Sequence, residues 1–171
     1  MITFSEIKTI QAITSGPRWF GCQVKRSKTS QQAFKTDESA PGLMAKNELD
    51  TRDDTICAGA NWKLLSASGE CYDVYGFHDD FHSIKDVPIA RVATGIHDEH
   101  GRVAILVVNQ ALYFGASMDH LLINPNQIRH HGIPVSDDAY DNDRDFGIDH
   151  NDMLTPFKTE GSTVYFDIFV P

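Results

Sequence analysis

The sequence predicts a mainly β domain with one short helix, preceded by a flexible N-terminal arm. The body of the chain alternates between runs rich in β-branched and aromatic residues and short turn segments, a pattern typical of strands. A single segment carries a full set of helix start and stop signals. The beginning of the chain is rich in Ser, Thr, Lys, Gln and Gly and has no sustained apolar period. We therefore divide the chain into an arm, residues 1–44, and a folded domain with a C-terminal extension, residues 45–171.

The arm is expected to hold one short element and a linker. Apolar residues recur at Phe4, Ile7 and Ile10, which is a helical spacing, so we predict a short amphipathic helix over residues 1–13. Residues 15–42 lack any period, and their polar composition predicts a flexible linker.

Strand and turn signals dominate the body. The β-rich runs Val87–Ile96 and Arg102–Asn109 are joined by an acidic connector that ends in Gly, residues 97–101, which predicts a hairpin. Thr163–Val170 predicts a terminal strand that follows a turn at Glu160-Gly161. No internal repeat is visible.

The predicted helix spans Pro125–His131. Asn124 is a good N-cap, Pro125 fits the first helical position, and Gln127 completes a capping box. Gly132 suits the C-terminal stop. These signals agree with one another, so the helix boundaries follow from the sequence.

Composition and cysteine usage indicate an intracellular, cytoplasmic protein. Apolar residues make up 41% of the 171 residues, and no apolar run approaches the roughly 20 residues that span a bilayer. Glu6 and Lys8 interrupt the N-terminus, so it lacks a signal-peptide core. Cys22, Cys57 and Cys71 are odd in number and widely spaced, which favours reduced thiols over a disulfide framework or a zinc site.

Charge is divided unevenly along the chain. Residues 1–48 carry seven Lys and Arg against four Asp and Glu, a net of +3, and residues 49–171 carry eight against twenty, a net of −12. The acidic body argues against a nucleic-acid-binding surface there. The basic stretch of residues 25–28 leaves a weak contact with a phosphate backbone open, although a solvated linker explains it more simply.

The octet of residues 48–55 contains the strongest chemical signal. Leu49 is followed by Asp50-Thr51, and Asp53 and Asp54 come shortly after. A carboxylate that the fold holds in a fixed position can serve as a general acid or base. An Asp-Thr pair alone more often caps a turn or a helix, so the interpretation also depends on a second segment of the chain.

Two segments resemble the protease region of copia-type retrotransposon polyproteins, a branch of the retropepsin-like family of aspartic proteases. The first is residues 48–55 with Ala58-Gly59 beyond it, similar to the branch's E-L-D-S-H-A-D-T and its Ala-Gly pair. The second comprises residues 109–114 and 119–128, and it resembles the family's V-L-Y-V-P … N-L-L-S-V-x-Q-L, an apolar strand that leads into a single helix. The resemblance covers residues 46–171 and leaves the arm unaccounted for.

This resemblance implies a small closed β-barrel-like domain of retropepsin type that acts as a homodimer on a peptide or polyprotein substrate. It implies neither a metal nor another cofactor. Asp50 corresponds to the catalytic acid/base and Thr51 to its brace. Arg52, Asp53 and Asp54 correspond to the substrate-binding and loop-anchoring positions, with Asp54 as the structural acid. Since the chain offers one Asp-Thr pair in a suitable apolar setting, two chains are required for one active site.

Two residues depart from the family's pattern. Arg52 stands where the family usually has Gly and the nearest branch often has His, and Asp53 stands where a small Ala is usual. A permanent cation beside Asp50 favours the ionised carboxylate, which opposes a shared proton. The alternative hypothesis is therefore a catalytically inactive dimerisation or interaction module with the same fold.

The flap that closes over substrate is expected before the second segment. Three places compete for it: the turn at Ser68-Gly69, the loop Tyr75–Val87 and the hairpin turn at residues 98–101.

Two polar segments have spacings known from metal sites. His78 and His82 lie four residues apart with carboxylates between them, but no apolar helical stripe or third ligand accompanies them, so a polar loop is favoured over zinc. Residues 141–152 place carboxylates at several positions of a calcium loop, yet Phe146 stands where Gly is needed. We predict an acidic solvated loop and keep an acidic metal-binding protein as a remote alternative.

Overall fold

The computed structural model describes residues 7–10, 23–26, 44–51, 55–76, 82–118, 121–150 and 152–170. Within them the chain is mainly β with one short helix, as the sequence predicts. The strands are β1 (Ile7–Ile10), β2 (Gln23–Arg26), β3 (Met44–Leu49), β4 (Cys57–Gly59), β5 (Lys63–Tyr75), β6 (Ile84–His97), β7 (Val103–Gly115), β8 (Leu121–Ile123), β9 (Val135–Ser136), β10 (Gly147–His150), β11 (Met153–Pro156), β12 (Lys158–Glu160) and β13 (Thr163–Phe169), and the helix is α1 (Pro125–His130).

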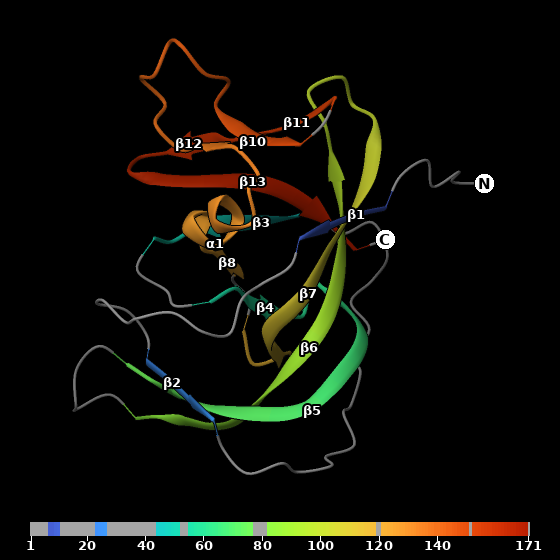
Figure 1. Cartoon of the computed structure of the whole chain (residues 1–171), viewed down its shortest axis with the longest axis vertical. Helices are drawn as coiled ribbons and strands as arrows, with labels where there is room; N and C mark the ends of the chain where they lie inside the picture. Colours follow the sequence, from blue (N-terminus) through green and yellow to red (C-terminus); the bar gives the residue numbers. More distant parts are fainter. Residues whose placement is uncertain are drawn as a thin grey trace.

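Most strands belong to one ten-stranded sheet with the order β1-β7-β4-β8-β3-β13-β6-β5-β2. Strand β12 attaches to β13, and an additional pairing joins β6 to β7. Strands β9, β10 and β11 form a separate three-stranded sheet. Figure 1 shows that the sheet curves strongly, with α1 close to β3 and β8. Neighbours in the sheet are often distant in sequence, and β8 in particular lies between β3 and β4.

The predicted central hairpin is confirmed and is longer than expected. Strands β6 and β7 pair antiparallel, and the pairing ends at His97 opposite Val103. In the turn between them, Asp98 Oδ1 accepts hydrogen bonds from the backbone N–H groups of His100 at 2.9 Å and Arg102 at 2.7 Å. The Asp98 side chain is buried and also pairs with the Arg102 guanidinium. These contacts satisfy the polar groups of the turn and fix the hairpin register.

Helix α1 is confirmed with Asn124 as its N-cap, and it ends one residue before the predicted His131. The capping box predicted at Gln127 stays a prediction, because the hydrogen bond shown for Oε1 of Gln127 comes from the backbone N–H of Ile56. The Asn124 side chain accepts a hydrogen bond from the backbone N–H of Asn126 at 2.8 Å, as an N-cap does. Past the end of the helix the chain turns at Gly132, whose φ of +76° belongs to the left-handed region that glycine tolerates. The terminal strand is also confirmed: β13 follows a turn with Gly161 at a φ of +61°.

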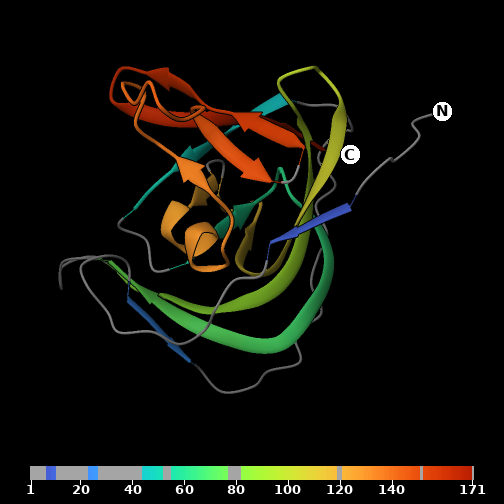
Figure 2. The same ribbon diagram turned by 45° about the horizontal axis from the view of Figure 1, so that its top comes forward.

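The main core is assembled from the large sheet, α1 and the small sheet. The ring of Phe157 lies 5.5 Å from that of Phe146 and 5.9 Å from that of Phe166, so aromatic contacts join the two sheets. Figure 2 shows the small sheet lying over one end of the large one. The largest fully buried side chains are Trp62, Phe166, Ile56, Ile96, Leu112, Leu121, Ile123, Ile128, Ile168, Val92, Val108 and Asn47.

The arm contains two strands where the sequence predicted other structure. Residues 7–10 form β1, which pairs parallel with β7 from Ile7 opposite Ile105, so the predicted helix is wrong for these residues. A short apolar spacing fits either element, and pairing with a long strand decides in favour of β. Residues 23–26 form β2 within the segment predicted as a flexible linker, and they pair antiparallel with β5. The rest of the arm lies outside the described residues.

Candidate active site

Asp50 lies where β3 ends, as the sequence predicts for a carboxylate on a strand-to-loop junction. Strand β3 runs parallel to β8, with Leu49 opposite Ile123. The backbone N–H of Asp50 donates a hydrogen bond of 3.0 Å to the carbonyl oxygen of Ile123. This bond extends the strand pairing by one residue and fixes the backbone from which the half-buried Asp50 side chain projects.

The chain is anchored again immediately after the loop. The backbone N–H of Ile56, a fully buried residue, donates a hydrogen bond of 3.0 Å to Oε1 of Gln127 in α1. Strand β4 then begins at Cys57, which lies opposite Leu122 of β8 in an antiparallel pairing. Both ends of the loop are therefore held by the segment that runs from β8 into α1.

Strand β4 is also the site of a close backbone approach. A Cβ atom on Gly59 would lie 2.1 Å from the carbonyl oxygen of Met118, which is closer than any side-chain carbon is found to a backbone oxygen. The backbone N–H of Trp62 donates to the carbonyl of Gly59 at 3.2 Å. The second residue of the Ala58-Gly59 pair is thus required by packing beside the end of β7.

The other loop residues predicted for the site are only partly described. Thr51 is exposed, and its role as a brace for Asp50 stays a prediction. Arg52, Asp53 and Asp54 lie outside the described residues, so their substrate-binding and loop-anchoring roles also stay predictions.

Two of the three places expected for a flap are held by strand pairing or by contacts with the small sheet. Ser68-Gly69 lies inside β5, where the pairing with β6 is irregular but the strand does not reverse. The turn at residues 98–101 is tied to the small sheet, because the N–H of Glu99 donates to the carbonyl of Leu154 at 3.1 Å. The third place, Tyr75–Val87, is only partly described: β5 ends at Tyr75, β6 begins at Ile84, and residues 77–81 lie outside the described residues. In both Figure 1 and Figure 2 the end of β5 and the start of β6 lie on the same side of the molecule as the end of β3.

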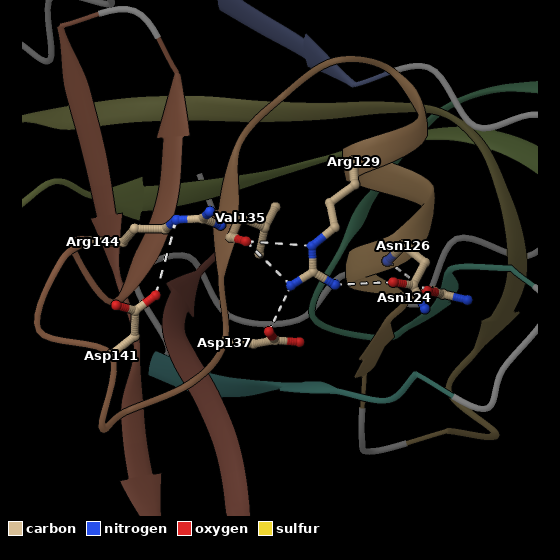
Figure 3. A network of polar contacts seen from close by, with 7 residues as sticks. All are labelled: Asn124, Asn126, Arg129, Val135, Asp137, Asp141 and Arg144. Carbon is tan, nitrogen blue, oxygen red and sulfur yellow. Dashed lines mark hydrogen bonds and ion pairs between the residues drawn. The ribbon is translucent and has the colours of Figure 1, made fainter.

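A polar network that the sequence did not reveal fixes the far end of α1 (Figure 3). Arg129 donates through Nη1 to Asn126 Oδ1 at 2.9 Å, and through Nε and Nη2 to the carbonyl oxygen of Val135 at 3.3 and 3.1 Å. Its Nη2 also pairs with Asp137. The network clamps the helix that carries Gln127 to the segment leading into β9. A basic residue in the last helical turn was its only sequence signal.

A cavity of about 530 Å³ lies beside this network, away from Asp50. It is lined by both basic and acidic side chains, so it has no dominant charge. Its lining residues are Arg129, Gly132, Ile133, Pro134, Val135, Ser136, Asp143, Arg144, Asp145, Gly147 and Asp149.

The segment compared with a calcium loop has a different local structure. Its residues Gly147–His150 form β10, which pairs with both β9 and β11. Before that strand, Asp141 Oδ1 accepts a hydrogen bond from the N–H of Asp143 at 2.9 Å, and Arg144 Nε lies 3.9 Å from Asp141 Oδ2. In the part of the chain that the structure describes, no three residues of the metal-binding types come together. His78, of the candidate zinc pair, lies outside that part.

Comparisons with protein-family models, with curated proteins and with solved structures found no match to this chain. Among the described residues, no helix has the length and apolarity needed to cross a membrane.

Proposed function

We propose that this chain is the aspartic endopeptidase domain of a retrotransposon-type polyprotein and that it acts as a homodimer. The observation that carries the proposal is the position of Asp50. It follows β3 directly, its backbone is bonded to β8, and the loop after it is held at the other end by Gln127 of α1. A loop that is anchored at both ends holds its carboxylate in a fixed position, as acid/base catalysis requires.

The sheet pairings support the barrel-like part of the proposal. Strands β7, β4, β8, β3, β13 and β6 pair in that order, and the additional pairing of β6 with β7 brings the series back to its start. A ring of pairings is how a small closed barrel removes its sheet edges. Asp50 directly follows β3, which is one of the strands of this ring.

The chemistry follows from placing two such loops together. Two carboxylates at close range do not both ionise, so they share one proton. The ionised carboxylate takes a proton from a water molecule while the protonated one donates to the carbonyl oxygen of the peptide bond. Each chain supplies one Asp50, so the site forms at the two-fold axis of a homodimer, and activity depends on protein concentration.

The substrate of this proposal is an extended peptide that binds as an added strand. We assign the flap of this proposal to the connection between β5 and β6, because the end of β5 and the start of β6 lie on the same side of the molecule as the end of β3 (Figures 1 and 2). Cys57 and Cys71 are both buried.

A second candidate function is a non-catalytic dimerisation or interaction module with the same fold. The observation that favours it is Arg52, a permanent cation two residues from Asp50 in the sequence. A cation there stabilises two ionised carboxylates and so opposes the shared proton.

Cleavage of a mixed peptide library, from mildly acidic to neutral pH, separates the two candidates. The comparison is between the unaltered chain, Asp50→Asn, and Asp167→Asn as a matched control. Asp167 lies on β13 and pairs with Lys158, so its substitution leaves the Asp50 loop intact. The endopeptidase proposal expects cleavage that is lost in Asp50→Asn, kept in Asp167→Asn, and dependent on protein concentration.

Two outcomes contradict the endopeptidase. Cleavage that survives in Asp50→Asn assigns the activity to another site or to a contaminant. Absence of cleavage in a folded, dimeric sample supports the interaction module, and restoration by Arg52→Gly then identifies Arg52 as the cause.

A further inference from the structure

Strand β5 has one edge that only the arm covers. On one side β5 pairs with β6, and on the other, among the described residues, it pairs with β2 alone. The register is antiparallel, from Gln23 opposite Tyr75 to Arg26 opposite Tyr72. Without β2 the backbone N–H and C=O groups on this side of Tyr72–Tyr75 form an open edge, and an open edge accepts another strand.

The charges of the two segments are complementary. Residues 23–26 carry Lys25 and Arg26 and no acidic residue, whereas the described hairpin residues 70–76 and 82–86 carry three acidic residues and one basic residue. In the strand register Lys25 stands opposite Asp73. A basic strand is thus paired with a strand from an acidic hairpin.

Asp73 is held as an anion at the centre of this edge. Its Oδ2 accepts a hydrogen bond from Lys85 Nζ at 2.8 Å, and its Oδ1 accepts one from the backbone N–H of Asp86 at 3.2 Å. The hydrogen bond from Lys85, followed by that from Asp86, keeps the pKa of Asp73 below its ordinary value. A strand with a Lys at the facing position therefore meets a carboxylate that is ionised at neutral pH and already paired with Lys85.

The edge also has a defined place in the molecule. It belongs to the end of β5 that lies on the same side of the molecule as the end of β3, and β2 runs along the outside of the β5–β6 hairpin in both views (Figures 1 and 2). A segment bound there therefore lies on the same side of the molecule as the end of β3, although it comes from the arm.

We propose that the β5 edge at Tyr72–Tyr75 is a docking site for an extended basic peptide, and that residues 23–26 occupy it as a displaceable intramolecular ligand. Four paired residues make a short strand, and a pairing of that length is marginal in isolation. Attachment to the same chain compensates for this, because it gives the segment an effective concentration on the order of millimolar. The docked arm then excludes other extended peptides from this edge.

If the chain is the proposed peptidase, the docked arm competes with substrate, and this role alone rests on the proposed function. Displacement of residues 23–26 opens the edge and raises the rate of cleavage of peptides supplied in trans. The docking itself does not depend on catalysis, and it is measured without any cleavage assay.

The test uses the full chain with the double substitution Val24→Pro/Lys25→Pro. In a strand paired on one side, the N–H groups of alternate residues donate to the neighbouring strand. One of any two consecutive residues is therefore a donor to β5, and replacing both by proline removes that hydrogen bond. Val24→Ala/Lys25→Ala is the matched control, since it shortens the same side chains and keeps both N–H groups. Hydrogen exchange is measured at the amides of Tyr72–Tyr75 that point away from β6, at several protein concentrations.

A second readout is direct binding of the arm sequence. A fluorescent peptide that spans residues 20–29, with Cys22→Ser to prevent oxidation, is titrated into each full-length variant. We expect the proline variant to bind it at least about tenfold more tightly than the unaltered chain, because the intramolecular competitor is gone. We also expect exchange at the β5 amides to be at least about tenfold faster in the proline variant without peptide, and to slow again when peptide is added.

Three results overturn the proposal. Unchanged exchange in the proline variant shows that β2 does not protect the edge. Equal peptide affinity in all variants shows that residues 23–26 do not compete for it. If exchange at these β5 amides in the unaltered chain slows as protein concentration rises, the strand that pairs with β5 comes from a second copy of the chain. Residues 23–26 are then not an intramolecular ligand.

Discussion

Replacement of Gln127 by Ala tests whether α1 holds the end of the Asp50 loop. The substitution removes Oε1, the acceptor of the 3.0 Å hydrogen bond from Ile56 N–H. Because Ile56 is fully buried, this N–H cannot form a hydrogen bond with water instead. A buried donor without a partner lowers the stability of the folded state by about 1–3 kcal/mol. Alanine is the better helix former by only a few tenths of a kcal/mol. The free energy of unfolding should therefore fall by about 1–2.5 kcal/mol.

Urea unfolding and hydrogen exchange at the Ile56 amide measure the two consequences separately. Asn126→Ala is the matched control, because this neighbouring residue is exposed and its side chain bonds Arg129 instead of the loop; we expect a loss within about 0.5 kcal/mol. Gln127→Glu keeps an oxygen at the same reach and should preserve protection of the Ile56 amide. If Gln127→Ala leaves both the unfolding free energy and this protection unchanged, Gln127 is not the anchor of the loop.

Two further predictions concern the frame around the site. Gly59→Ala should lower the melting temperature and cost about 1–3 kcal/mol, since the new methyl group meets the carbonyl oxygen of Met118 and the backbone must shift; an unchanged melting temperature contradicts the close approach. Burial alone raises the pKa of Asp98, but the hydrogen bonds from Arg102 and from the backbone N–H groups outweigh it and hold the pKa below its ordinary value. The stability that Asp98 contributes is therefore present above about pH 4 and lost as the pH falls through the lowered pKa. Urea midpoints measured from pH 6 downward should show this loss in the unaltered chain and a weaker pH dependence in Asp98→Asn. If the midpoint changes with pH in the same way in both proteins, Asp98 does not contribute this stability.

Elements with complete local signals were predictable from the sequence. Helix α1 starts at Pro125 behind the Asn124 cap and turns at Gly132, because caps and left-handed positions depend on a few adjacent residues. The β6–β7 hairpin was predictable for the same reason. The exact length of the hairpin was not predictable, since a strand continues for as long as a neighbouring strand pairs with its backbone N–H and C=O groups.

Pairings between distant segments were not predictable. No local pattern shows that β8 lies between β3 and β4, or that Gln127 accepts a hydrogen bond from Ile56, because each depends on how the sheet is ordered. Strand β1 was misassigned as a helix because its partner, β7, begins about a hundred residues later in the chain. The position of Asp50 at the end of a strand was implied by the resemblance of residues 48–55 to the family's motif, but its anchoring required the structure.

The hydrogen bond between Ile56 and Gln127 joins residues 71 positions apart, and this separation sets an order of events during synthesis. A ribosome that adds 5–20 residues per second needs about 4–14 s to proceed from one to the other. Until then β3 and β4 have no strand between them, and the Asp50 loop has neither of its anchors. The nascent chain therefore passes through a period in which its carboxylate loop is exposed but unassembled.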